Sequence, residues 1–102
     1  MPTFVTVANT NDLKPGEGKA IEINGREIAL FNVNGRFYAI DNTCVHRGGP
    51  LAEGEVADDI VTCPWHGWEY DVKTGVNPLN SQIKVKKYEV MVEGYRVKVK
   101  VE

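Results

Sequence analysis

The sequence predicts an all-β protein, built as an antiparallel sandwich or meander, and three observations support this. Apolar and polar residues alternate over several short segments, which is the period of a half-buried strand. Asn24-Gly25 and Asn34-Gly35 are hairpin signals ten residues apart, and two such turns in succession indicate a meander. Near the end of the chain, two alternating segments flank Glu93-Gly94, which predicts a further hairpin.

The expected elements follow from these signals in chain order. A first strand is expected at residues 4–7, and the glycines and proline of residues 9–18 then predict a loop with one helical turn at 11–14. Further strands are expected at residues 19–23, 27–33, 36–40, 60–62, 84–92 and 95–101. The segment from about 42 to 75 interrupts the meander as a small insert. The chain from 1 to 102 is expected to form a single domain.

The interrupting segment holds every cysteine and every histidine of the chain. They form two tight pairs, Cys44-Val45-His46 and Cys63-Pro64-Trp65-His66, with sixteen residues between the pairs. Two thiolates and two imidazoles make a complete four-ligand metal site. The alternative is that these are unrelated core cysteines and surface histidines. The close pairing favours the metal site.

Two kinds of metal site are compatible with these ligands. Structural zinc accepts two cysteines and two histidines, although zinc sites usually pair Cys with Cys and His with His. A [2Fe–2S] cluster can instead take two thiolates on one iron and two imidazoles on the other. Each pair would then give one ligand to each iron, which explains why each pair mixes Cys with His. The mixed pairs favour the iron–sulfur cluster.

The two segments resemble the ligand boxes of Rieske proteins. The first box runs from Cys44 to Gly48, and the second reads Cys63-Pro64-Trp65-His66-Gly67-Trp68-Glu69-Tyr70-Asp71. This resemblance, which covers nearly the whole chain, implies a Rieske-type fold with an inserted cluster-binding subdomain. It implies one [2Fe–2S] cluster held by Cys44, His46, Cys63 and His66. The residues expected to surround the cluster are Gly48, Gly49, Leu51, Trp65, Gly67, Trp68, Tyr70 and Pro78.

Departures from the high-potential members of the family are informative. Those proteins join the two boxes by an extra disulfide, and Gly49 and Trp65 stand at the matching positions here. They also place a serine donor where this chain has Trp68, whereas Tyr70 remains as a donor toward the Cys44 sulfur. Fewer donors leave the more negative reduced cluster less stabilised. The sequence therefore predicts a potential near the low end of the Rieske range, roughly −150 mV.

Bulk properties exclude several classes of protein. A net charge of −2 argues against a general nucleic-acid binder. No apolar run approaches the roughly twenty residues of a membrane span, and no secretory signal is recognisable, so a cytoplasmic location is expected.

Charge is distributed unevenly along the chain. Residues 43–73 hold two basic and six acidic side chains, a net charge of −4, whereas residues 84–102 carry +3. Either these are two solvated surfaces, or they orient the metal end toward a basic partner.

The resemblance implies a one-electron carrier, a Rieske-type ferredoxin between an NAD(P)H-dependent flavin reductase and a terminal oxygenase. The alternative is the small Rieske subunit of an assimilatory NAD(P)H nitrite reductase, whose partner would be the large subunit. The chain is not expected to be an enzyme itself, because no cysteine or histidine remains for a second centre once the cluster is built. A monomer is the expected state of a small shuttle. The remaining hypothesis is a zinc-stabilised binding module.

Overall fold

The computed structural model of the protein describes residues 3–45, 48–65 and 67–101, and it confirms the nearly all-β prediction. The strands are β1 Thr3–Asn9, β2 Gly18–Ile23, β3 Arg26–Val33, β4 Arg36–Asp41, β5 Glu55–Ala57, β6 Ile60–Thr62, β7 Glu69–Asp71, β8 Val76–Asn77, β9 Asn80–Lys84, β10 Lys87–Tyr88, β11 Val90–Glu93 and β12 Arg96–Val101. Two short 3₁₀ turns, η1 Thr10–Asp12 and η2 Leu51–Glu53, complete the described elements. No helix in the described ranges is long and apolar enough to cross a membrane.

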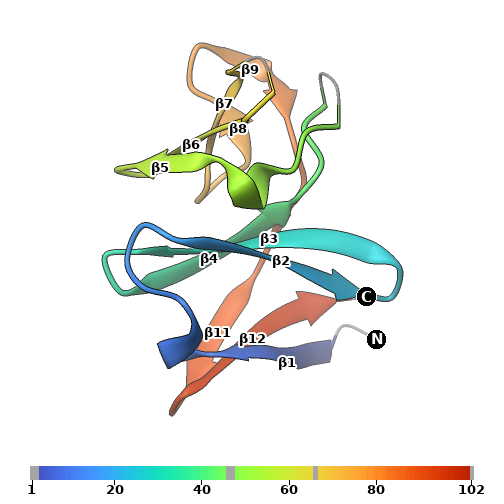
Figure 1. Cartoon of the computed structure of the whole chain (residues 1–102). Helices are drawn as coiled ribbons and strands as arrows, with labels where there is room; N and C mark the ends of the chain where they lie inside the picture. The colour runs from blue at the N-terminus through green and yellow to red at the C-terminus, as the bar shows by residue number, and fades with distance from the viewer. Residues whose placement is uncertain (1–2, 46–47, 66, 102) are drawn as a thin grey trace.

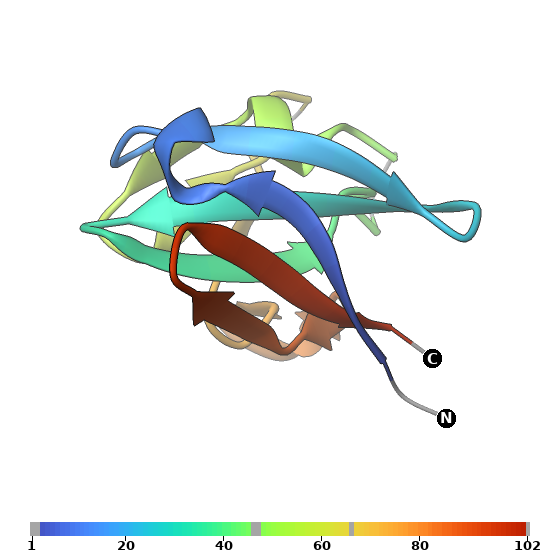
Figure 2. The same cartoon turned by 90° about the horizontal axis from the view of Figure 1, so that it is seen from below.

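The strands form three tiers (Figure 1). A base sheet has the order β1-β12-β11, and a central sheet has the order β10-β4-β3-β2. The third tier contains the sheet β5-β6-β7 and the hairpin β8-β9. Seen from below, the base sheet crosses in front of the central sheet, and the start of β1 runs beside the end of β12 (Figure 2). The central sheet is therefore the layer on which both other tiers pack.

The central sheet is buried on both faces, which explains the apolar run in β3. Ala29 and Phe31 face one hydrophobic cluster, which also contains the two cysteines and core residues of the third tier. Ile28 and Leu30 face the other cluster, together with residues of the base sheet such as Val97. A strand covered on both sides reads as a continuous apolar segment, not as an alternation. The third tier therefore packs on one face of the central sheet, and the base sheet packs on the other.

Both predicted asparagine–glycine turns are confirmed. Ile23 pairs with Arg26 and Val33 pairs with Arg36, so each turn contains two residues. Asn24 and Asn34 have φ angles of 51° and 53°, in the left-handed region that two-residue hairpins require. The last hairpin differs by one residue from the prediction, because Glu93 pairs with Arg96 and the turn is Gly94-Tyr95. Glycine then occupies the first central position, where a positive φ is needed.

The strand predicted at residues 84–92 is wrong as a single element. The chain here forms the end of β9, then β10, which pairs with β4 in the central sheet, and then β11, which pairs with β12 in the base sheet. It changes sheets at Glu89, whose carbonyl accepts the Lys100 N–H at 2.9 Å. Alternating hydrophobicity identifies the two faces of a strand but not its neighbours. The sequence pattern therefore could not reveal the crossing.

Short strands of the third tier went unpredicted, apart from β6. Pro78, which is expected near the cluster, lies with Leu79 in the turn of the hairpin β8-β9. The helical turn expected at residues 11–14 is the 3₁₀ turn η1, where the Asn9 and Asp12 side chains make a capping box. Strands of two or three residues carry too few side chains to show a periodicity.

Candidate metal centre

The two loops that carry the cysteines close in the same way. Cys44 follows β4 and Cys63 follows β6 directly. In the first loop, the Gly48 N–H donates to the Cys44 carbonyl at 2.8 Å, and the Cys44 N–H donates to the Gly49 carbonyl at 3.0 Å. In the second loop, the Gly67 N–H donates to the Cys63 carbonyl at 3.2 Å, and the Cys63 N–H donates to the carbonyl of the fifth residue on, Trp68, at 2.7 Å.

This shared closure depends on glycine at one position of each loop. Gly48 and Gly67 both have φ of +75°, a conformation that other residues adopt only with strain. Each lies four residues after its cysteine, so the two loops have the same length although their histidines stand at different positions. Gly48 and Gly67 were predicted near the cluster, and the structure shows them as the residues that turn each loop back.

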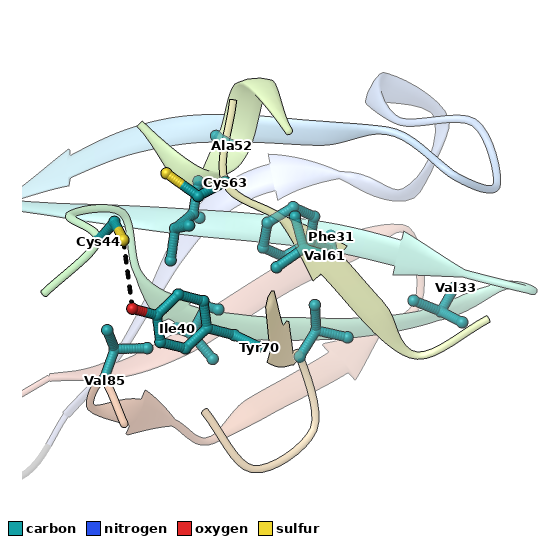
Figure 3. Packing of buried hydrophobic residues seen from close by; sticks show 12 residues of the cluster. Phe31, Val33, Ile40, Cys44, Ala52, Val61, Cys63, Tyr70 and Val85 are labelled. Carbon is teal, nitrogen blue, oxygen red and sulfur yellow. Dashed lines mark hydrogen bonds between the residues drawn. The ribbon is translucent and has the colours of Figure 1, made fainter. Parts of the chain in front are cut away.

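The structure brings the two cysteines into one core. Cys44 and Cys63 are 1% and 2% exposed, respectively, and both belong to the hydrophobic cluster that contains Phe31, Leu51 and Tyr70. Figure 3 shows both sulfur atoms at the same end of this cluster. Neither of these two cysteines forms a disulfide. Two thiols buried together on separate loops can hold a metal group between the loops.

Tyr70 connects the second loop to the first. Its side chain is fully buried on β7, and its hydroxyl lies 3.2 Å from the Cys44 Sγ (Figure 3). The Val45 N–H donates to the same hydroxyl oxygen at 3.3 Å, and once the Cys44 sulfur is a thiolate, only the phenolic O–H can donate in the contact between them. Burial and the neighbouring Cys44 raise the pKa of the Tyr70 hydroxyl above its usual value. The phenol therefore stays a protonated donor.

The environment of Cys63 combines burial with a backbone donor. Burial raises the pKa of the Cys63 thiol, and the neighbouring Cys44 raises it further. The backbone N–H of Trp65 acts in the opposite direction, because it hydrogen-bonds the sulfur and stabilises the thiolate. A metal held by Cys63 would displace this thiol proton, since only the thiolate is a ligand.

The loops touch through Gly49. A Cβ added at Gly49 would lie 2.7 Å from the Cys63 Sγ and 3.1 Å from the Trp65 Cβ, so no side chain fits there without movement. The family resemblance had placed Gly49 and Trp65 opposite each other, and the structure does bring them together. Leu51 is fully buried in the same core, and Trp68 is half-buried against it. Trp65 itself is 50% exposed.

The places of some predicted site residues remain predictions. His46 and His66 lie outside the described residues, as does Arg47, and their roles stay predictions. Pro78 is exposed in the turn of β8-β9, next to Leu79, and its expected place over the cluster also stays a prediction.

Sequence reasoning also missed residues beside the cysteines. Glu53 and Glu55 line an open pocket of about 330 Å³ together with Cys63 and Pro64. Asn42 is 2% exposed, and its side chain hydrogen-bonds Glu27 on β3 and Ala52 in η2, after the first loop. An asparagine two residues before a ligand resembles any loop asparagine in the sequence, and only its burial distinguishes it. Glu53 and Glu55 were counted in the negative charge of residues 43–73, but their place beside Cys63 was not predicted.

The sequence pattern of the Rieske [2Fe-2S] domain matches residues 3–89, most of the chain. The chain belongs to the Rieske [2Fe–2S] family. A similar Rieske protein is the ferredoxin component of the naphthalene 1,2-dioxygenase/salicylate 5-hydroxylase systems of a Ralstonia species, 35% identical over 97% of this chain and 96% of that protein.

Solved structures agree with the family assignment. The ferredoxin in the complex of reduced oxygenase and oxidized ferredoxin of carbazole 1,9a-dioxygenase is 30% identical, with a TM-score of 0.85 over 93% of this chain and 99% of that one. A protein from Mycobacterium tuberculosis described as an NADH-dependent nitrite reductase small subunit has a TM-score of 0.92 over 100% of this chain and 97% of its own. It is 22% identical and shows the Rieske fold alone.

The cofactor of a Rieske domain is one [2Fe–2S] cluster, as the sequence predicted in preference to zinc. The described residues fit such a group. Cys44 and Cys63 place two thiols, not joined in a disulfide, in a buried apolar core, and Gly49 has no room for a side chain beside the Cys63 Sγ. Donors reach both sulfurs, from Tyr70 and from the Trp65 backbone.

Proposed function

We propose that this Rieske protein is a one-electron carrier, which passes electrons from an NAD(P)H-dependent flavin reductase to a terminal oxygenase. The observation that carries this proposal is the pair of buried thiols on two matching loops at one end of a small domain. Its similarity to ferredoxin components of dioxygenase systems over nearly the full length of both chains supports the same function.

The proposed cluster ligands are Cys44, His46, Cys63 and His66. The bound cluster supplies reversible uptake of one electron, and two thiolates leave its oxidised form neutral, so that reduction is easier than with four thiolates. The protein supplies the environment. Leu51 and Tyr70 exclude water from the cysteine side, and the phenol of Tyr70 donates toward the Cys44 sulfur. This donor stabilises the additional negative charge of the reduced state.

A role as a carrier, and not as an enzyme, is supported by the ligand inventory. The chain has two cysteines and two histidines, and the cluster takes all four. A mononuclear oxygenase iron would need further histidines and a carboxylate. The flavin, the nicotinamide and the oxygen chemistry therefore belong to partner proteins. We assign the protein to the cytoplasm and expect a monomer, because a shuttle must reach two partners in turn.

The docking surface is proposed at the ligand loops. Val45 and Trp65 are 56% and 50% exposed beside the buried cysteines, and exposed aromatic side chains are common at protein interfaces. The surrounding segment 43–73 carries a net charge of −4. A partner with a basic face would be attracted to this end, and the attraction would weaken as salt is added.

The alternative function is the small subunit of an assimilatory nitrite reductase, which the sequence resemblance also allows and whose fold, as in the Mycobacterium tuberculosis protein, is the same. The two functions differ in their stable partners. A nitrite reductase subunit would co-purify with a large sirohaem subunit, whereas a shuttle would purify alone.

The deciding experiment is reconstitution of electron transfer. Purified protein with the red-brown colour and the reduced-state paramagnetic signal of a Rieske cluster is mixed with NADH, a flavin reductase and an aromatic-ring dioxygenase. Hydroxylated product that depends on the added chain supports the carrier. A colourless zinc protein would contradict the cluster itself, and stable co-purification with a sirohaem subunit would replace the carrier with the alternative.

A further inference from the structure

A single buried asparagine stands at the start of the first ligand loop and hydrogen-bonds the residues at its end. Asn42 stands two residues before Cys44 and is 2% exposed. Its side-chain Oδ1 accepts the Ala52 N–H at 2.8 Å, and its Nδ2 donates to the Glu27 Oε2 at 3.1 Å. Its backbone carbonyl accepts the Leu51 N–H at 2.7 Å, and its backbone N–H donates to the Glu27 carbonyl at 3.1 Å.

These four bonds join three separate parts of the chain. Glu27 lies near the start of β3 in the central sheet, whereas Leu51 and Ala52 begin η2, after the ligand loop. Asn42 itself lies just past the end of β4. One side chain therefore links the entry of the loop, its exit and the sheet beneath it.

The hydrogen bonds continue from Asn42 to the cysteine. Thr43 forms an antiparallel bridge with Pro50, and the next bond along this ladder joins the Cys44 N–H to the Gly49 carbonyl. Gly49 is also the residue that touches the Cys63 Sγ side of the second loop. This ladder connects Asn42 to Gly49, so we expect a displacement of Asn42 to move Gly49, where the two loops meet.

We propose that Asn42 is a positioning residue for the metal centre, which holds the first ligand loop in register with the second and so slows loss of the cluster and helps set its potential. The inference rests on the family's cluster but not on the identity of the redox partners. Groups outside the ligand shell that orient the ligands typically change metal affinity by about 10–100-fold when they are lost.

The amide chemistry of Asn42 gives a sharp test. Both ends of the amide are used, one as acceptor and one as donor, so Asn42→Asp keeps the shape and the bond from Ala52 but loses the donor to Glu27. It also places a second carboxylate against that of Glu27. Adding Glu27→Gln to this variant supplies a new amide donor at position 27 and removes the repulsion. Glu27→Gln alone keeps an acceptor for Asn42 and should behave as wild type.

The chain contains a matched control. Asn32 is the other buried asparagine of the described residues, 4% exposed. Its Nδ2 donates to the Leu13 carbonyl at 2.8 Å, and its Oδ1 accepts the Gly35 N–H at 2.8 Å. Both side chains bond two partners from a buried position, but Asn32 secures the β3-β4 turn, away from the ligand loops. Asn32→Asp therefore reports the cost of losing a buried amide donor elsewhere in the fold.

The experiment compares holoproteins in two measurements. The first is the rate at which the visible absorbance of the cluster decays in excess iron chelator, well below the unfolding temperature. The second is the reduction potential by protein-film voltammetry. Asn42→Asp is expected to accelerate cluster loss roughly tenfold or more and to shift the potential, whereas the double variant with Glu27→Gln returns both values toward wild type. Asn32→Asp is expected to lower the urea midpoint but to leave both measurements unchanged.

Three outcomes would overturn the proposal. The first is wild-type cluster loss and potential in Asn42→Asp. The second is equal acceleration in Asn32→Asp at an equal loss of stability, because Asn42 would then act only through the fold. The third applies if Asn42→Asp yields no folded holoprotein: recovery in the double variant supports the proposal, and failure to recover overturns it. None of these results depends on a reductase or an oxygenase, so a failure of the carrier function would be recognised separately.

Discussion

The hydroxyl of Tyr70 lies 3.2 Å from the Sγ of Cys44, although the two residues are 26 positions apart in the chain. A donor to a ligand sulfur favours the reduced cluster, which carries one more negative charge. Tyr70→Phe should therefore lower the reduction potential by roughly 20–60 mV, the equivalent of about 0.5–1.5 kcal/mol for one electron. Protein-film voltammetry measures the shift. Tyr88→Phe, in the other core, is the control and should leave the potential unchanged.

The potential of the wild-type protein should lie near the low end of the Rieske range, roughly −150 mV. Glu53 and Glu55 line a pocket with Cys63, and their negative charge opposes the addition of an electron. Replacing both by glutamine should raise the potential, and the rise should shrink at high salt. Glu22→Gln, on an exposed position of β2, is the control. A wild-type potential near the top of the family's range would contradict this prediction.

Gly49→Ala should impair the metal centre. The new Cβ would lie 2.7 Å from the Cys63 Sγ, closer than any real contact of this kind, so the two loops must separate. Cluster affinity should fall roughly tenfold or more, measured as iron bound per chain and as the rate of loss to a chelator. Gly94→Ala is the control, because Gly94 has a φ of +62° but open space around it. That variant should lose stability through backbone strain and keep its iron. Equal iron content in the two variants would be inconsistent with the close contact at Gly49.

The environment of Tyr88 predicts that the protein loses folding stability at alkaline pH. Its hydroxyl donates to the Asp41 Oδ1 at 2.5 Å, and burial together with this carboxylate raises the pKa of Tyr88 above 10.0, the value of an unfolded tyrosine, while Arg26 opposes the shift. A raised pKa means that the stabilisation is complete below pH 10.0 and is lost as the pH rises through the folded-state pKa.

Tyr88→Phe should therefore cost about 1–2 kcal/mol of unfolding free energy at pH 8, and the difference from wild type should narrow at pH 11. Urea unfolding at the two pH values measures both differences. Tyr95→Phe serves as the control, because Tyr95 is 71% exposed and its replacement should change stability little at either pH. A difference for Tyr88→Phe that stays constant or widens would show that the proton of Tyr88 is not linked to folding.

The sequence predicted the parts of the fold whose signals are local. Asn24-Gly25 and Asn34-Gly35 fixed the β2-β3-β4 meander, because a two-residue turn with positive φ leaves one register for its strands. The pattern failed at Glu89, where the chain passes from the central to the base sheet. Strand partners are a tertiary property, and alternation along one segment contains no information about them.

The same distinction applies to the metal centre, where the sequence predicted local features but not tertiary contacts. The spacing of the Cys and His pairs predicted two ligand loops, and the structure brings the thiols of Cys44 and Cys63 into one core. The support around them was not predictable. The Oδ1 of Asn42 accepts the Ala52 N–H, ten positions further on, and this bond exists only because the chain returns beside Asn42 after the ligand loop. Polar residues that act through tertiary hydrogen bonds have no periodic signature in a single sequence.

The equal closure of the two cysteine loops has a consequence for assembly of the holoprotein. Each loop is held by bonds that involve only backbone groups of its own segment, from Cys44 to Gly49 and from Cys63 to Trp68. These bonds need no metal, so they fix the backbone at Cys44 and Cys63 as part of the fold. An incoming iron–sulfur donor would therefore meet two thiols that already lie together in one core.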